Sequence, residues 1–172
     1  MPRNSGAFTH VLLALFLLLA RRFGEMKLMK GTAILIADDD ENDVFFVRRA
    51  FERVGLVNPL FVTNDGQEAI DYLQGLPPYQ DRAQYPLPGL LLLDLKMPRV
   101  NGFDVLSWLA QRPDLKELCV VVLSSSSHEE DIRKAKELGA HDFRTKPSDF
   151  HQLVELVRDL QARWLRQPIN AG

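Results

Sequence analysis

The sequence predicts a single α/β domain built on a five-stranded parallel, doubly wound sheet with helices on both faces. From Thr32 onward, short apolar or β-branched runs alternate with stretches of helical periodicity, which is the pattern of parallel strands joined by crossover helices. Four consecutive leucines at 90–93 show no polar alternation, as expected for a strand buried on both faces. A chain of 172 residues, 46% hydrophobic and 26% charged, has room for one such domain.

The expected strands are short, and each ends at a polar residue or a turn. In chain order they cover residues 33–37, 60–63, 90–93, 119–123 and 142–145. Each is followed by apolar side chains at helical spacing, over residues 44–54, 69–73, 105–109, 132–138 and 150–160. Asn42 or Asp43 suits the N-cap of the first helix, and Gly55 and Gly139 suit the ends of the first and fourth helices. The proline-rich stretch 75–89 predicts a surface loop.

The two ends of the chain do not share this pattern. We expect an N-terminal extension over residues 1–30, the folded domain over 31–167 and a tail over 168–172. The apolar run 11–20 is shorter than the stretch of about 20 residues that a membrane-spanning helix needs. Arg21 and Arg22 follow it where a signal-peptide cleavage site would need small residues. We favour an extension without function, which would follow if synthesis began at Met26 or Met29. A weakly membrane-associating helix is the alternative.

Composition and charge exclude several classes of function. The formal net charge is -2, and no basic tract with interleaved aromatic residues is present, so nucleic acid is not an expected partner. The single cysteine, Cys119, lies in the apolar run 119–123 and is expected to be buried. One cysteine cannot form an internal disulfide, which fits a reducing compartment. The sequence also lacks a glycine-rich phosphate loop, a nucleophile elbow and a zinc-binding helix.

Polar side chains follow four of the expected strands at the point where each ends. They are Asp38 with Asp39, Asp94, Ser124 and Lys146. Because the carboxyl ends of parallel strands meet at one edge of a sheet, these groups would converge there. Crowded carboxylates repel one another and favour a hard divalent cation with oxygen ligands, for which Mg²⁺ is the obvious candidate. The lysine and the hydroxyl would then contact phosphoryl oxygens, and Asp94 would be the nucleophile of a phosphoryl transfer.

Each of these features also has a simpler interpretation. An aspartate cluster after a strand often caps a helix, a serine run is commonly a polar loop, and a Lys-Pro pair commonly marks a turn. Their occurrence at one edge, in the right order along the chain, favours the functional interpretation.

With these motifs in place, the chain resembles the receiver domains of two-component response regulators, over roughly residues 31–166. The motifs that carry the resemblance are Ile36-Ala37-Asp38-Asp39, Asp94-x-x-Met97-Pro98-x-x-x-Gly102, Ser124 and Phe143-x-x-Lys146-Pro147. Residues 58–60 and 65–73 are most similar to stand-alone receivers that partner phytochrome-type histidine kinases. The resemblance implies the flavodoxin-like receiver fold.

The resemblance also implies roles for individual residues. Asp94 would accept a phosphoryl group from a phosphohistidine. Asp39, the Asp94 carboxylate and the backbone carbonyl of Lys96 would bind Mg²⁺, with Asp38 acting mainly through a metal-bound water. Lys146 would pair with the phosphoryl group, and its peptide bond to the following proline would be cis.

Two further residues would transmit the signal. Ser124 would turn its hydroxyl toward the phosphoryl group, and Phe143 would follow inward and shift the surface formed by the fourth helix, the fifth strand and the fifth helix. Phe143 stands where tyrosine is commoner in the family, so this coupling would be steric.

The function implied is that of a cytoplasmic single-domain response regulator that takes part in a Mg²⁺-dependent phosphorelay and is not a dedicated enzyme. Its partners would be a sensor histidine kinase, of phytochrome type by the narrower likeness, and a downstream protein target. A second copy of this chain is the alternative to a downstream target, on the hypothesis that the last helix and Trp164 offer more apolar surface than the core requires.

A phosphatase of the haloacid-dehalogenase type is the alternative enzyme. Its nucleophile would lie in the Asp-x-Asp that the sequence carries at Asp38 and Asp40. This alternative leaves the Asp94 motif unexplained.

Overall fold

The leucine run forms the middle strand of a parallel sheet, as its uniform hydrophobicity predicts. The structure of the protein, a computed structural model, describes residues 32–165, in which the strands are ordered β2-β1-β3-β4-β5. The strands are β1 (Ile34–Ala37), β2 (Leu60–Thr63), β3 (Leu90–Leu93), β4 (Cys119–Ser124) and β5 (Asp142–Thr145). All neighbouring strands are parallel, so the expected doubly wound five-stranded sheet is confirmed. The predictions for the N-terminal extension, its apolar run and the tail concern residues outside the described range.

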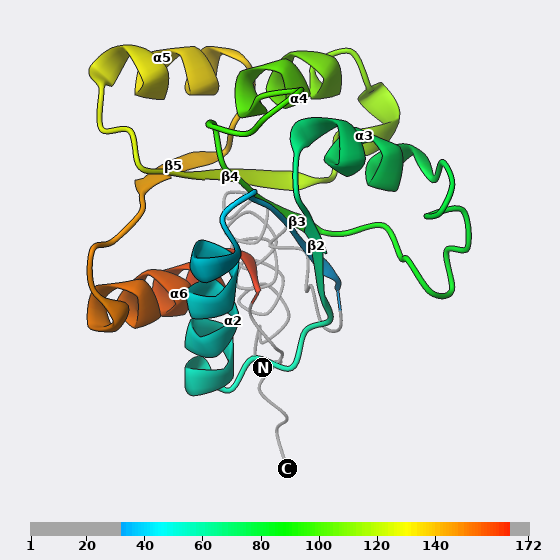
Figure 1. Cartoon of the computed structure of the whole chain (residues 1–172). Helices are drawn as coiled ribbons and strands as arrows, with labels where there is room; N and C mark the ends of the chain where they lie inside the picture. Colours follow the sequence, from blue (N-terminus) through cyan, green and yellow to red (C-terminus); the bar gives the residue numbers. More distant parts are fainter. Residues whose placement is uncertain (1–31, 166–172) are drawn as a thin grey trace, which may run out of the picture.

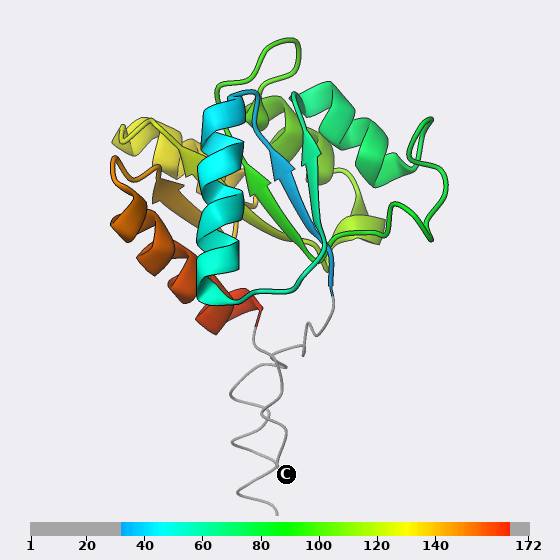
Figure 2. The ribbon, with the colours of Figure 1, turned by 60° about the horizontal axis from the view of Figure 1, so that its bottom comes forward.

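Helices cover both faces of this sheet. They are α2 (Glu41–Val54), α3 (Gly66–Gln74), α4 (Gly102–Leu109), α5 (Glu129–Glu137) and α6 (Phe150–Trp164), with a short 3₁₀ turn at Pro113–Leu115. In Figure 1, α3, α4 and α5 lie above the sheet and α2 and α6 lie below it. Figure 2 brings α2 and α6 forward, side by side on one face. No helix within residues 32–165 is long and apolar enough to cross a membrane.

The alternation of side chains along β3 divides the core in two. Leu91 and Leu93 pack with residues of α3 and α4 on one face, whereas Leu90 and Leu92 pack with residues of α2 and α6 on the other. All four leucines are almost completely buried, because parallel strands covered by helices have no solvent-facing side. The strand therefore delivers the next residue, Asp94, to the carboxyl edge of the sheet at a fixed position.

The first helix begins earlier than the sequence suggested. The N-cap is Asp40, whose carboxylate accepts hydrogen bonds from the N–H groups of Asn42 and Asp43, so the prediction of either of those residues as the cap is wrong. The turn after β1 is tight enough to bring Asp40 over the open N–H groups of the helix. At the other end, Gly55 has a φ of 77° and closes the helix as expected.

The proline-rich loop between α3 and β3 is held by aromatic packing. The rings of Tyr79 and Tyr85 pack against each other and against Tyr72 of α3. The Arg82 guanidinium donates hydrogen bonds to the backbone carbonyls of Tyr72 and Leu73, which satisfies carbonyls at the end of α3. The loop therefore packs on α3 and lies away from the carboxyl edge of the central strands (Figure 1).

Candidate functional site

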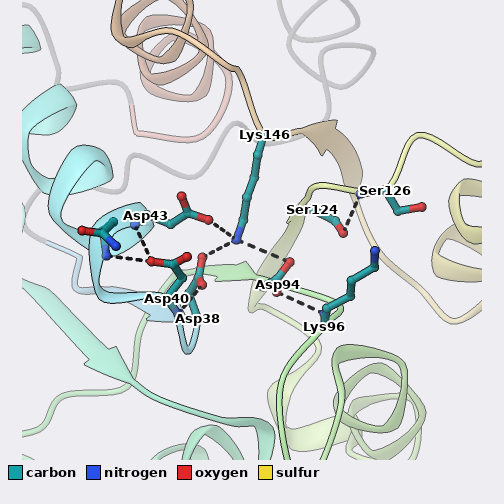
Figure 3. A network of polar contacts seen from close by, with 9 residues as sticks. Asp38, Asp40, Asp43, Asp94, Lys96, Ser124, Ser126 and Lys146 are labelled. Carbon is teal, nitrogen blue, oxygen red and sulfur yellow. Dashed lines mark hydrogen bonds and ion pairs between the residues drawn. The ribbon is translucent and has the colours of Figure 1, made fainter.

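The register of the sheet places the two aspartates of the candidate site next to each other. Ala37 of β1 pairs with Leu93 of β3, so the following residues, Asp38 and Asp94, leave the sheet side by side. The Asp94 N–H donates to the Ala37 carbonyl at 2.9 Å, which extends the ladder by one residue. Figure 3 shows both carboxylates at this edge.

Three carboxylates form a compact acidic cluster there. Oxygen atoms of Asp38, Asp39 and Asp94 lie within 4.8 Å of one another. Asp38 and Asp94 are buried and Asp39 is exposed. Burial raises the pKa of Asp38 above its usual value, although the hydrogen bond from Lys146 opposes this shift. Such a donor set fits a hard divalent cation that keeps waters on its exposed side.

The two oxygens of Asp94 have different surroundings. Oδ2 accepts a hydrogen bond from the backbone N–H of Lys96 at 3.1 Å. Oδ1 is buried and has no hydrogen-bond partner among the described residues. A buried carboxylate oxygen without a hydrogen bond is costly, and a cation or a covalent bond at Oδ1 would reduce that cost.

Lys146 reaches the cluster from the end of β5. Its backbone N–H donates to the Ser124 carbonyl at 2.8 Å, and its ammonium lies 2.8 Å from Asp38 Oδ2, 2.6 Å from Asp43 Oδ2 and 3.6 Å from Asp94 Oδ1. Burial disfavours the charge on Lys146, but the hydrogen bonds to Asp38 and Asp43 outweigh it and raise the pKa above its usual value. The lysine therefore stays protonated beside the carboxylates.

The peptide bond after Lys146 differs from the prediction. The cis peptide bond found among residues 32–165 joins Pro77 and Pro78, so the bond between Lys146 and Pro147 is trans, contrary to the prediction. With the trans bond, the Lys146 backbone already continues the β5 ladder and its side chain reaches the cluster.

Asp43, considered in the sequence only as a helix cap, proves to be a partner of Lys146. Its position in the first turn of α2, which starts at the same edge, is the signal that could have revealed it.

Ser124 ends β4 inside the protein. It is fully buried, and its hydroxyl accepts a hydrogen bond from the Ser126 N–H at 3.2 Å. The Ser126 hydroxyl in turn donates to Asp131 in the first turn of α5. Figure 3 shows Ser124, the last residue of β4, and Ser126, in the loop that follows, beside Asp94, so a hydroxyl lies at the same edge as the acidic cluster.

The loop after Asp94 is fixed by a close backbone approach. A Cβ atom on Gly102 would lie 2.3 Å from the Asp94 carbonyl oxygen, so no larger residue fits there without a shift. The Gly102 N–H donates to the Leu95 carbonyl at 3.1 Å. Asn101 and Asp104 form a capping box at the start of α4. Arg99 has a positive φ of 62°, so this short loop is sharply turned.

This arrangement can support one kind of chemistry especially well. A buried carboxylate oxygen next to a cation-binding cluster and a lysine is suited to attack phosphorus and to hold the resulting charge. A parallel five-stranded sheet with this carboxyl edge defines a receiver domain of two-component signalling.

The chain belongs to the response regulator receiver family, because the model of the "Response regulator receiver domain" matches residues 34–158. The response regulator Rcp1 of Synechocystis sp. is 33% identical over 132 residues, which cover 77% of this chain and 88% of Rcp1. A crystal structure of the Mn²⁺-bound form of Rcp1 superposes with a TM-score of 0.71 and 30% identity, over 82% of this chain and 99% of that chain.

Two other solved structures are similar to the same extent. The phosphorylated cyanobacterial phytochrome response regulator RcpA gives a TM-score of 0.71 and 30% identity, over 77% of this chain and 93% of that one. Response regulator RPA3017 of R. palustris, described as acting in red light signaling, gives a TM-score of 0.75 and 30% identity, over 80% of this chain and 96% of that chain. The expected likeness to stand-alone receivers of phytochrome systems is confirmed.

The phosphatase alternative is not supported. Asp40, the second aspartate of the Asp-x-Asp, caps α2 and is exposed, so it is used to start a helix. The family match assigns the chain to signalling proteins of two-component systems.

Proposed function

We propose that Asp94 accepts a phosphoryl group from the phosphohistidine of a sensor histidine kinase, with Mg²⁺ bound by Asp38, Asp39, Asp94 and the carbonyl of Lys96. The observation that carries this proposal is the buried Oδ1 atom of Asp94, which lacks a hydrogen-bond partner in the described part of the chain and lies 3.6 Å from the Lys146 ammonium. The exposed side of Asp39 leaves the cluster open to solvent and to a donor.

In the proposed reaction, Oδ1 of Asp94 attacks the phosphorus atom of the donor. A P–O bond forms, the P–N bond breaks, and the histidine ring takes up a proton and leaves as neutral imidazole. The bound cation would offset the negative charge of the transferred group. Lys146 would contact a phosphoryl oxygen, since the Lys96 N–H holds Oδ2 and Oδ1 lies on the side of the Lys146 ammonium. Ser124 would supply the hydroxyl that responds to phosphorylation.

An exposed aromatic surface supports a protein as the donor. Phe45 and Phe46 of α2 and Phe150 of α6 are 56%, 48% and 41% exposed, and Phe46 contacts both of the other rings. This aromatic surface borders a cavity of about 120 Å³ whose lining also includes Lys146 and Pro147. An apolar patch beside a reactive group is typical of a protein interaction site.

The likeness to Rcp1, RcpA and RPA3017 supports a phytochrome-type kinase as that partner, and a downstream protein as the target. We propose that the protein acts in the cytoplasm as a signalling module and not as a dedicated enzyme, without binding nucleic acid. The receiver would extend over residues 31–167, between an extension and a tail.

A homodimer remains part of this proposal, although its expected surface changes. Trp164 is partly buried and its ring packs against His141, so it offers little free apolar area. The aromatic surface on α2 and α6 is the larger exposed apolar area near the site. A sedimentation coefficient that stays constant over a wide concentration range would contradict dimerisation.

The acceptor assignment is tested with acetyl phosphate and Mg²⁺, followed by intact mass. The native chain should gain one phosphoryl group, and Asp94→Asn should gain none. Asp81→Asn, in the exposed loop after α3, is the control and should be labelled like the native chain. Equal labelling of Asp94→Asn and the native chain would refute the assignment.

A further inference from the structure

Asp43 is the nearest carboxylate to the lysine of the site, yet it lies outside the metal-binding cluster. Its Oδ2 atom is 2.6 Å from the Lys146 ammonium, closer than Asp38 at 2.8 Å or Asp94 at 3.6 Å. Asp43 belongs to the first turn of α2, and its own N–H donates to the N-cap Asp40. The helix start therefore fixes where this carboxylate lies. Figure 3 shows Asp43 on the side of Lys146 that faces away from Asp94.

The ammonium and a divalent cation compete for the same oxygens. Lys146 pairs with Asp38 and lies near Asp94, and both of these carboxylates belong to the cluster that could hold a metal. When a cation binds there, it draws these oxygens away from the lysine and repels the ammonium, because like charges this close interact strongly in a partly buried site. The ammonium then needs a carboxylate that the cation does not use.

We propose that Asp43 is a positioning residue that holds the Lys146 ammonium at the border of the acidic cluster and so keeps Asp38 and Asp94 available to the divalent cation. Without Asp43, the ammonium would pair with Asp38 and Asp94 alone and would act as a competing cation. Asp43 would thus increase the affinity for the metal without contacting it. The inference rests on the proposed metal site, but it does not require that Asp94 is ever phosphorylated.

The test is the Mg²⁺ affinity of the unphosphorylated full-length chain, measured by isothermal titration calorimetry. Asp43→Asn keeps the shape of the side chain and removes its charge. It should weaken Mg²⁺ binding by about tenfold, the size expected for loss of one charge-assisted hydrogen bond. Glu41→Gln is the matched control, since Glu41 is an exposed acid in the same helical turn and is not among the described carboxylates that pair with Lys146. Glu41→Gln should change the Mg²⁺ affinity by less than about twofold.

A double-mutant cycle separates positioning from a general charge effect. In a Lys146→Met background there is no ammonium to hold, so adding Asp43→Asn should have no larger effect than adding Glu41→Gln. Equal weakening by Asp43→Asn in both backgrounds would overturn the proposal, because Asp43 would then act only as a remote charge. Unchanged affinity of Asp43→Asn in the native background would also overturn it. Circular dichroism of each variant confirms the fold before titration.

The two proposals can fail separately. If acetyl phosphate never labels Asp94 while the cycle shows the expected coupling, the proposed function fails and the positioning role of Asp43 stands. If Asp94 is labelled but the cycle shows no coupling, only the role of Asp43 is rejected.

Discussion

The side chain of Asp94 is oriented by one hydrogen bond and left reactive at its other oxygen. The Lys96 N–H fixes Oδ2, and burial removes the water that would otherwise solvate Oδ1. Lys146 lies on the Oδ1 side at 3.6 Å, within reach of a group bound to that atom. The same backbone geometry that ends β3 therefore selects which oxygen would act as nucleophile.

Cys119 illustrates a buried side chain without a reactive role. It starts β4 within the core cluster of α2 and α6, and burial raises the pKa of its thiol to about 12. At neutral pH the folded protein should therefore hold it as an unreactive thiol, because the thiolate is the nucleophile. We expect a thiol reagent such as DTNB to modify Cys119 only after denaturation. Native-state labelling as fast as that of free cysteine would contradict this.

The loop from β3 to α4 should be sensitive to one added methyl group. In Gly102→Ala the new Cβ would meet the Asp94 carbonyl oxygen at 2.3 Å, so the backbone beside the acceptor would have to shift. We expect a loss of about 1–3 kcal/mol in the free energy of unfolding, measured with urea, together with weaker Mg²⁺ binding.

Gly55→Ala is the control for that substitution. Gly55 has a φ of 77° with open space around it, so alanine there strains only the local backbone. The Gly55→Ala variant should lose about 1–2 kcal/mol in the free energy of unfolding and should bind Mg²⁺ as tightly as the native chain. Equal metal affinity in the Gly102→Ala variant and the native chain would show that the loop tolerates the shift.

The aromatic surface on α2 and α6 should affect phosphorylation by a protein but not by a small molecule. Phe46 is 48% exposed and borders the cavity that includes Lys146, so Phe46→Ser should remove a contact with the donor and leave Asp94 unchanged. Transfer from a cognate histidine kinase should fall by about tenfold or more, since aromatic residues are common interface hot spots. Labelling by acetyl phosphate should stay the same.

Val57→Ser is the matched control, because Val57 is 80% exposed just beyond the opposite end of α2. Equal losses with both phosphodonors for Phe46→Ser would mean that the substitution damages the site itself.

The strands were predictable from the sequence because a strand buried on both faces leaves little freedom in its pattern. The leucine run and the apolar run at Cys119 were assigned to strands for that reason, and both form central strands of the sheet. The start of α2 was misassigned because the choice among Asp40, Asn42 and Asp43 depends on the geometry of the preceding turn. Sequence spacing does not specify that geometry.

The same limit applies to the candidate site. The site residues that follow strands could be predicted from the sequence, because the carboxyl ends of parallel strands meet at one edge of the sheet. The contact between Asp43 and Lys146, which lie 103 positions apart in the chain, depends on where α2, packed against α6, begins relative to the end of β5, and it had no counterpart in any motif. The trans bond at Pro147 likewise depends on the backbone path after β5.

Across the whole molecule, the acidic cluster joins chain segments that the sheet alone holds together. Asp38 and Asp39 follow β1, and Asp94 follows β3, so a cation bound by all three would link the two central strands. A ligand that binds only the folded state stabilises it by mass action, by about 2.7 kcal/mol at a concentration of 100 times Kd. For a domain of this size, that corresponds to an increase of about 5–10 °C in Tm.

We therefore expect Mg²⁺ to raise the Tm of the native chain in a thermal melt followed by circular dichroism, relative to KCl at equal ionic strength.

The pH dependence of this increase in Tm follows from Asp38. Because burial raises its folded-state pKa, its contribution to stability in the metal-free protein is present below the unfolded-state pKa and is lost as pH rises through the folded-state pKa. Mg²⁺ replaces the lost stability only where the carboxylate is ionised, so the increase in Tm should be full at neutral pH and disappear as Asp38 becomes protonated in acid. At neutral pH, where the increase is full, Asp94→Asn should reduce it. A melt in which Mg²⁺ and KCl give the same Tm at neutral pH would mean that the three carboxylates do not form a metal site.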